Sequence, residues 1–185
     1  MTDLILYKPL YPFQISQRFG ENQAVVYKTW GILGHPGLDC VRPAPYLTEG
    51  CNVRAACEGT VSFVGKDANN AYGVVIITDN TYSYKGLPGC SLMRFKLIYW
   101  HILPNPPVKV GDKVEIGDVI ATASHTGTPG LNPHLHFGMK PVANGESTTT
   151  WYDSASNNGY NGNIDPEPYL SAKSAYEYIQ SNPNG

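Results

Sequence analysis

The chain has 185 residues, 42% of them hydrophobic, so its length and composition fit one domain whose core needs no disulfide or metal. Its formal net charge of −2 offers no basic surface to a nucleic-acid backbone or an anionic membrane. No stretch reaches the roughly 18 apolar residues of a membrane span, and the N-terminal segment has no secretion signal. We expect one domain over residues 1–185, a monomer with no nucleic-acid partner and no membrane insertion.

Turn residues and short apolar runs predict a mainly β protein. The 19 glycines and 15 prolines separate β-branched and aromatic runs, a pattern typical of an antiparallel sheet. The predicted strands are residues 61–64, 74–78, 97–101, 114–116, 119–123 and 134–139. Two Gly-Asp pairs, at 111–112 and 117–118, predict a hairpin within residues 110–120. Only residues 168–180 have helical character, which predicts one short C-terminal helix.

Two segments, residues 21–34 and 143–163, are predicted to be long loops. Loops of this length in a compact domain are more often functional than idle. Their aromatic residues are candidates for the walls of a binding groove, with ordinary loop packing as the alternative. These residues are Tyr27, Trp30, Trp151, Tyr152 and Tyr160.

The four cysteines, Cys40, Cys51, Cys57 and Cys90, lack the spacing of a zinc-thiolate site. Buried free thiols are therefore expected. A bridge within residues 40–57 is the alternative in an oxidising compartment.

Four of the five histidines fall into arrangements that suit a metal site. His134 and His136 are two residues apart in a predicted strand, where alternate side chains project from the same face about 6.6 Å apart. One imidazole can therefore bind a metal while the other lies beside the open coordination position. The spacing does not say which of them is the ligand.

His35 and Asp39 offer a nitrogen and an oxygen ligand four residues apart. Pro36 and Gly37 disfavour a helix between them and predict a turn that leads into a strand. With one histidine of the pair, these side chains would make three ligands and leave a fourth tetrahedral position for water, as in catalytic zinc sites. Zinc lowers the pKa of bound water toward about 7 and polarises a substrate carbonyl. One Zn²⁺ ion in a hydrolytic site is therefore expected.

A hydrolytic site also needs a group that accepts the proton of water. His101, at the end of a predicted strand, and His134 are candidates, because an imidazole pKa of about 6.5 suits proton transfer near neutrality. The alternative for a lone histidine is ordinary packing. His125 is expected in a turn at the rim of the site, with substrate contact as its alternative role.

Five sequence motifs, which follow one another in a fixed order, extend these observations over most of the chain. They are GHPGLD (34–39), VRAACEGTV (53–61), YWH (99–101), VGDKV (110–114), and TG followed by NPHLHF (126–137). Together they resemble the lysostaphin-type (M23) zinc endopeptidases of peptidoglycan, in register over a core of about residues 17–170. The resemblance implies that His35, Asp39 and His136 bind zinc, and that His101 and His134 assist catalysis. It also implies a compact antiparallel β-sheet core with long loops that wall a groove.

The resemblance further implies hydrolysis of peptide cross-links in the bacterial cell wall, with peptidoglycan stems and cross-links as partners. Enzymes of this family act outside the cytoplasmic membrane. A chain without a secretion signal then resembles a phage lysin or a virion-associated wall hydrolase, with a mature fragment of an exported enzyme as the alternative. A second functional class is a catalytically silent protein that binds peptidoglycan or activates a hydrolase. It predicts the loss of a metal or catalytic position, and none is lost in this sequence.

The chain departs from the family pattern beside the expected groove. Residues 40–52 replace a short turn, and residues 84–90 are extra sequence. His125 stands where asparagine is common, and Gly138 stands where glutamate is common. These changes leave the expected metal ligands intact and the cleaved bond open.

Overall fold

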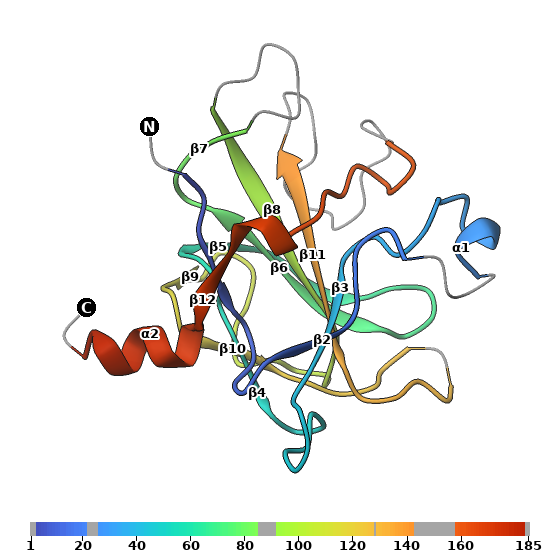
Figure 1. Ribbon diagram of the computed structural model, residues 1–185, viewed down its shortest axis with the longest axis horizontal. Helices are drawn as coiled ribbons and strands as arrows, with labels where there is room; N and C mark the ends of the chain where they lie inside the picture. The colour runs from blue at the N-terminus through green and yellow to red at the C-terminus, as the bar shows by residue number, and fades with distance from the viewer. Residues whose placement is uncertain (1–2, 22–25, 85–91, 128, 143–157, 184–185) are drawn as a thin grey trace.

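The computed structural model describes residues 3–21, 26–84, 92–127, 129–142 and 158–183 (Figure 1). The strands are β1 (Leu6–Lys8), β2 (Gln14–Gln17), β3 (Leu38–Val41), β4 (Asn52–Arg54), β5 (Gly59–Lys66), β6 (Tyr72–Thr78), β7 (Tyr82–Ser83), β8 (Leu92–Ile102), β9 (Lys113–Val114), β10 (Val119–Thr122), β11 (Leu135–Val142) and β12 (Leu170–Ser174). The helices are α1 (Val26–Thr29), the 3₁₀ turn η1 (Glu167–Tyr169) and α2 (Ala175–Ser181). The prediction of a mainly β fold with an antiparallel sheet and a short C-terminal helix is confirmed.

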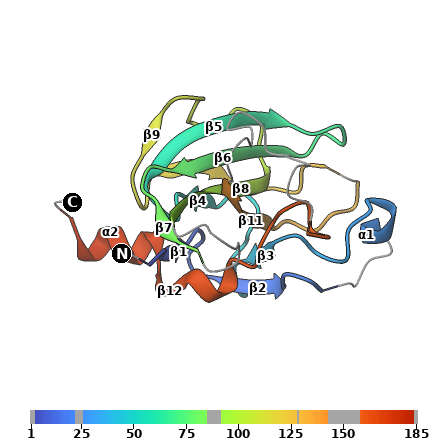
Figure 2. The same ribbon diagram turned by 90° about the horizontal axis from the view of Figure 1, so that it is seen from above.

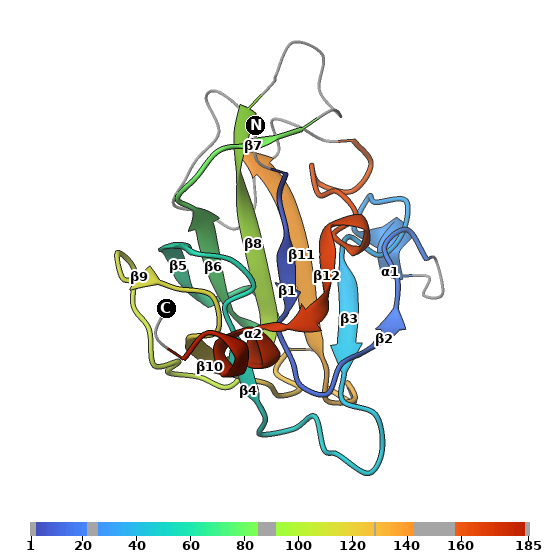
Figure 3. The same cartoon turned by 60° about the vertical axis from the view of Figure 1, so that its left-hand side comes forward.

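One large antiparallel sheet dominates the fold. It has eight strands in the order β2-β3-β11-β8-β6-β5-β9, with β7 paired to β8 off this path. Two small sheets complete the described part of the chain: β4 pairs with β10 antiparallel, and β1 pairs with β12 parallel. In Figure 3, β1 and β12 lie in front of β8 and β11, and Figure 2 shows the β5–β6 side and β2 at opposite sides of the molecule.

Side chains alternate along the strands of the large sheet, so one face packs against the hydrophobic core and the opposite face carries polar side chains. The side chains that face the core from β3, β8 and β11 are Leu38, Cys40, Phe95, Leu97, Tyr99, Leu135, Phe137 and Met139. All are 0% exposed. Because successive residues of a strand project to opposite faces, Asp39 and His136 must point away from this core. The pattern that buries the core therefore also presents polar groups on the other face.

The prediction of a hairpin within residues 110–120 is wrong. β9 pairs with β5 and β10 pairs with β4, so the two strands do not pair with each other. The Gly-Asp turns do form, and Gly111 and Gly117 have φ angles of 94° and 95°, which glycine adopts without steric cost. Each turn redirects the chain toward a strand that is distant in sequence. The predicted strand 114–116 accordingly shares only Val114 with β9.

The C-terminal helix is shorter than predicted. Residues 168–180 contain the end of η1, all of β12 and all but the last residue of α2. Leu170 and Ser174 pair with Leu6 and Lys8 of β1, and this tertiary pairing overrides the local helical preference. Ser174 then starts α2 with a capping box, since its hydroxyl accepts the Glu177 N–H at 3.1 Å. Among the described residues, no helix is long and apolar enough to span a membrane.

Three of the cysteines, Cys40, Cys51 and Cys57, are free thiols, and burial raises the pKa of each. The fourth, Cys90, lies outside the described residues, as do residues 22–25 and 143–157 of the two predicted loops. Of the remainder of loop 21–34, α1 occupies residues 26–29. The expected free thiols are therefore present wherever the structure describes a cysteine.

Tyr99 connects β8 to the chain on the other side of the core. Its hydroxyl is fully buried and accepts the Ala56 N–H at 3.0 Å. We expect Tyr99→Phe to lower the free energy of unfolding by about 1–3 kcal/mol, because it leaves a buried N–H without an acceptor. Urea denaturation measures this loss. Tyr11→Phe is the control, since the Tyr11 ring is 48% exposed, and an equal effect of both substitutions would contradict the prediction.

Candidate metal centre

Strand register brings Asp39 and His136 together. The two residues are direct partners in the antiparallel pairing of β3 with β11. Both side chains leave the sheet on the face opposite the core, and His136 Nδ1 lies 3.2 Å from Asp39 Oδ1. Residues that are 97 positions apart in sequence thus place a nitrogen and an oxygen at one point.

His35 reaches the same point from the segment before β3. It is 3% exposed, and its Nδ1–H donates to the main-chain carbonyl of Arg18 at 3.2 Å. This hydrogen bond leaves the Nε2 lone pair free, 3.0 Å from Asp39 Oδ1 and 2.9 Å from His136 Nδ1. The described part of the chain contains no other group of three residues with metal-ligand spacing.

These three atoms suit a zinc ion. Tetrahedral ligands about 2.0–2.1 Å from zinc are about 3.4 Å apart, so separations of 2.9–3.2 Å need to widen by only a few tenths of an ångström. Three electron-pair donors at such short range repel one another unless a proton or a cation lies between them. The donor set of two imidazoles and one carboxylate is one that zinc accepts.

Gly37 makes room for the His136 ring. A Cβ at this position would lie 2.9 Å from His136 Nε2 and Cε1, and 2.8 Å from the Phe137 carbonyl oxygen. Such distances are shorter than van der Waals contact, so only glycine fits between the turn and the ring. The sequence motif of a histidine and an aspartate flanking Pro-Gly therefore has a steric reason in addition to its turn chemistry.

His101 reaches this face through an unusual backbone conformation. In a regular strand it would alternate with Trp100 and point toward the core beside Tyr99. Its φ of 64° lies in the left-handed region, which histidine adopts more readily than most residues with a side chain. The ring instead lies beside His134, with centroids 4.6 Å apart, and 6.3 Å from His136.

His101 and His134 are held in the same tautomer. His101 Nδ1–H donates to the Thr126 carbonyl at 2.6 Å, and His134 Nδ1–H donates to the Asn132 carbonyl at 2.7 Å. When neutral, each ring therefore carries its lone pair on Nε2. The Nε2 atom of His134 lies 3.6 Å from Asp39 Oδ1, so the pair borders the three candidate ligands.

The local environment lowers the pKa of two of these imidazoles, those of His101 and His136, and lowers the pKa of the Asp39 carboxyl. Burial, together with the nearby His134, lowers the pKa of His101 to about 4. Burial also lowers the pKa of His136, although the hydrogen bond to Asp39 partly offsets it. Burial opposes ionisation of Asp39, but the hydrogen bond from His136 and the adjacent His35 imidazole outweigh it and hold the pKa of that carboxyl well below its usual range. Neutral imidazoles beside a carboxylate are the protonation states that metal binding requires.

The remaining candidates take different positions. His125 is exposed, as expected for the rim, and its Nδ1 lies 2.8 Å from Glu49 Oε2. Tyr27 is buried, accepts a hydrogen bond from Gln17 and has its ring 6.0 Å from that of His35. Trp30 is 54% exposed, whereas Tyr160 packs on Phe19. Trp151 and Tyr152 lie outside the described residues.

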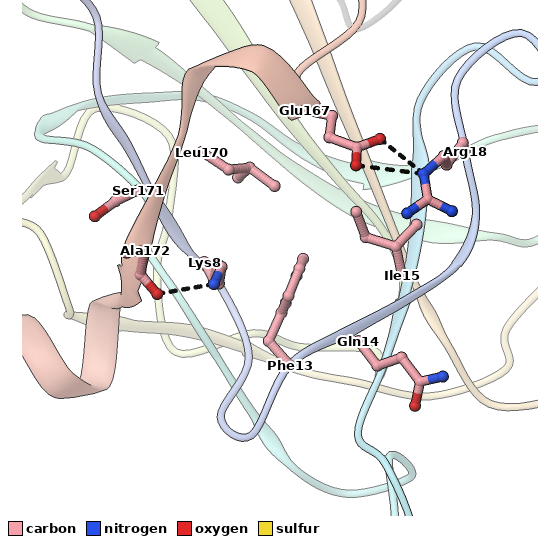
Figure 4. Close-up of a pocket in the computed structure, with 9 residues that line it drawn as sticks. All are labelled: Lys8, Phe13, Gln14, Ile15, Arg18, Glu167, Leu170, Ser171 and Ala172. Carbon is pink, nitrogen blue, oxygen red and sulfur yellow. Dashed lines mark hydrogen bonds and ion pairs between the residues drawn. The ribbon is translucent and has the colours of Figure 1, made fainter.

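A groove of about 590 Å³ lies elsewhere, between β2 and β12, and no histidine lines it (Figure 4). Glu167 pairs there with the Arg18 side chain at 3.1 Å, and Lys8 donates to the Ala172 carbonyl. Arg18 connects this groove to the histidines, since its main-chain carbonyl accepts from His35. The groove therefore lies next to Arg18, which orients His35, and not next to the candidate metal ligands themselves.

Sequence reasoning did not find the groups that orient the imidazoles. The acceptors are the carbonyls of Arg18, Thr126 and Asn132. Every residue carries a carbonyl, so no residue type could have signalled them. The sequence also gave no sign that Glu49 contacts the segment near the histidines, because a single carboxylate in a loop forms no recognisable motif.

Comparison with known proteins places this geometry in a family. Residues 34–150, which contain all five histidines, match the sequence profile of peptidase family M23. The chain belongs to peptidase family M23. No curated protein matches the sequence.

Solved structures of M23-type peptidases have the same fold. A structure of LytU is 23% identical with a TM-score of 0.57, and the match covers 86% of both chains. The catalytic domain of lysostaphin from Staphylococcus simulans is 22% identical with a TM-score of 0.56, over 85% of this chain and 91% of that one. A zinc containing peptidase from Vibrio cholerae is 23% identical with a TM-score of 0.57, and the match covers 89% of this chain but 39% of that one.

Replacement of Gly37 tests the steric argument. We expect Gly37→Ala to weaken zinc binding by about 10- to 100-fold, because the added methyl displaces the His136 ring. Competition against a chelator of known affinity measures the change. Gly138→Ala is the matched control, since a Cβ there would lie 3.4 Å from Ile98, an ordinary contact. Equal zinc affinity of the Gly37 variant and the wild type would show that the ring is not confined.

Stability of the metal-free protein should depend on His101. Its pKa is about 4 in the folded state and about 6.5 in the unfolded state, so the unfolded state binds the proton first as the pH falls. Stability is therefore full above about pH 6.5 and decreases toward pH 4. Between pH 7.5 and pH 4.5, in chelator, this one group should cost about 2–3 kcal/mol. Urea titrations should show that loss in the wild type and less of it in His101→Asn, whose side chain tolerates the left-handed backbone. Identical pH dependence would contradict the assignment.

Proposed function

We propose that the protein is a zinc-dependent endopeptidase that hydrolyses peptide cross-links of bacterial peptidoglycan, with one zinc ion held by His35, Asp39 and His136. The observation that carries the proposal is the convergence of His35 Nε2, Asp39 Oδ1 and His136 Nδ1 beside two oriented imidazoles. Membership of family M23 supports peptidase chemistry and a cell-wall substrate. The similarity to lysostaphin, an antimicrobial peptidase, and to a zinc-containing peptidase agrees with this function.

A zinc ion in this site would activate a water molecule and polarise the scissile carbonyl. The protein supplies the orientation of its own ligands. The Arg18 carbonyl holds His35 by its Nδ1–H, so that Nε2 faces the site. Gly37 and the pairing of β3 with β11 hold His136 and Asp39. Groups fixed in this way need little rearrangement when the substrate binds.

His101 and His134 provide the proton transfer. Both present an Nε2 lone pair, because their Nδ1–H groups are engaged by main-chain carbonyls. The low pKa of His101 keeps it neutral and ready to accept a proton at neutral pH. Once protonated, an imidazole donates a charge-assisted hydrogen bond to the developing oxyanion or returns the proton to the leaving amine.

Ligand and proton-transfer residues should separate in their phenotypes. We expect His136→Ala to lose stoichiometric zinc. His101→Asn should retain zinc and lose turnover by about 100-fold or more, in the range of a general acid or base. Metal analysis of the purified variants and peptide-bond hydrolysis measure the two effects. The control is Asp79→Asn, which changes a carboxylate bonded to Thr60 and Lys113. Full activity of His101→Asn would remove that residue from the mechanism.

Muropeptides of defined cross-link chemistry test the function itself. The zinc-loaded protein should release new amino termini, which mass spectrometry assigns to a D-alanyl cross-link, a stem-to-bridge bond or a glycine bridge. Tight zinc binding without any released amine would instead favour a protein that binds peptidoglycan or activates another hydrolase. A single catalytic domain, an extracytoplasmic place of action and a phage origin stay predictions within this proposal.

A further inference from the structure

The loop between β3 and β4, residues 42–51, reaches the histidines through one carboxylate. Glu49 Oε1 accepts the Ser124 hydroxyl at 2.9 Å, and Glu49 Oε2 lies 2.8 Å from His125 Nδ1. The loop is also fastened to the same segment by its main chain, since Gly50 N–H donates to the Ala123 carbonyl at 2.9 Å. Figure 1 shows this loop at the lower edge of the molecule, where β11 begins.

Ser124 connects that carboxylate to both proton-transfer histidines. Its N–H donates to the His101 carbonyl at 2.8 Å, and its carbonyl accepts the His134 N–H at 3.2 Å. Ser124 is 2% exposed, so its hydroxyl depends on a protein acceptor, which Glu49 provides. Ser124 thus contacts the main chain of both imidazole-bearing residues, and the exposed Glu49 carboxylate accepts the hydrogen bond of its side chain.

The position of Ser124 matters because His101 is held in a costly conformation. A left-handed φ of 64° persists only where neighbouring contacts impose it. Two hydrogen bonds hold His101, one from the Ser124 N–H to its carbonyl and one from its ring to the Thr126 carbonyl. A shift of Ser124 would therefore move the His101 backbone and the adjacent His134 together.

We propose that Glu49 is a positioning residue, which holds Ser124 and thereby sets the geometry of the His101–His134 pair. The role rests on the proposed peptidase function, since it concerns the histidines that transfer the proton. An exposed polar contact such as that of Glu49 with His125 contributes only about 0–1 kcal/mol to stability. The expected effect of Glu49 is on the position of the histidine rings, because a misplacement of about 1 Å in a catalytic group lowers the rate by up to about 100-fold.

Kinetics of paired variants test this role. Glu49→Ala and Ser124→Ala should each lower kcat by about 10-fold or more, with little change in KM and full zinc content. The double variant should lose no more than either single variant, because both break one connection. Glu49→Gln keeps an acceptor for the Ser124 hydroxyl and should recover most of the activity. Asp79→Ala is the matched control, since Asp79 also joins a hydroxyl, that of Thr60, to a basic group, Lys113.

A spectroscopic measurement separates failure of this inference from failure of the proposed function. Two-bond ¹H–¹⁵N spectra report the tautomer of each histidine without any substrate. In the wild type, His101 and His134 should be Nδ1–H tautomers, and Glu49→Ala should lose this preference while Asp79→Ala keeps it. Unchanged tautomers in Glu49→Ala, or additive losses of kcat in the double variant, would overturn the role of Glu49. If the wild type proved inactive on every muropeptide, the tautomer result would still decide it.

Discussion

The pairing of β3 with β11 is the constraint on which the site depends. It sets Asp39 opposite His136, and a slip of one residue would turn one of the two side chains into the hydrophobic core. The apolar residues on either side, Leu38, Cys40, Leu135 and Phe137, prevent that slip because they are fully buried in the correct register. The free energy that stabilises the core therefore also holds the candidate metal ligands in place.

Main-chain carbonyls fix the orientation of three histidine rings. Three of the histidines donate Nδ1–H to a carbonyl, and in each case Nε2 is left to face the site. This arrangement assigns complementary tasks to chemically identical side chains. His35 presents its lone pair to a metal position, whereas His101 and His134 present theirs beside it. Burial keeps His101 neutral, whereas the hydrogen bond from His136 keeps Asp39 charged.

The loop of residues 42–51 is attached to the chain that follows β10. Ser124 donates its hydroxyl to the Glu49 carboxylate, and Ala123 exchanges main-chain hydrogen bonds with Gly50 and Cys51. Both anchor points, Ala123 and Ser124, follow directly after β10. Those residues lead directly to the segment that bears His134. In the proposed role of Glu49, the connection between β3 and β4 is part of the support for the histidine pair.

The sequence by itself determined the mainly β class, most strands of the large sheet and the candidate residues His35, Asp39, His101, His134 and His136. Period-two alternation and donor chemistry are local properties, which the residue order records directly. Only the tertiary structure decided that β9 and β10 pair with different strands, that β12 replaces part of the predicted helix, and that Glu49 reaches Ser124. Those outcomes depend on contacts between residues that are distant in sequence, and the local pattern of residue types does not specify which distant residues will be in contact.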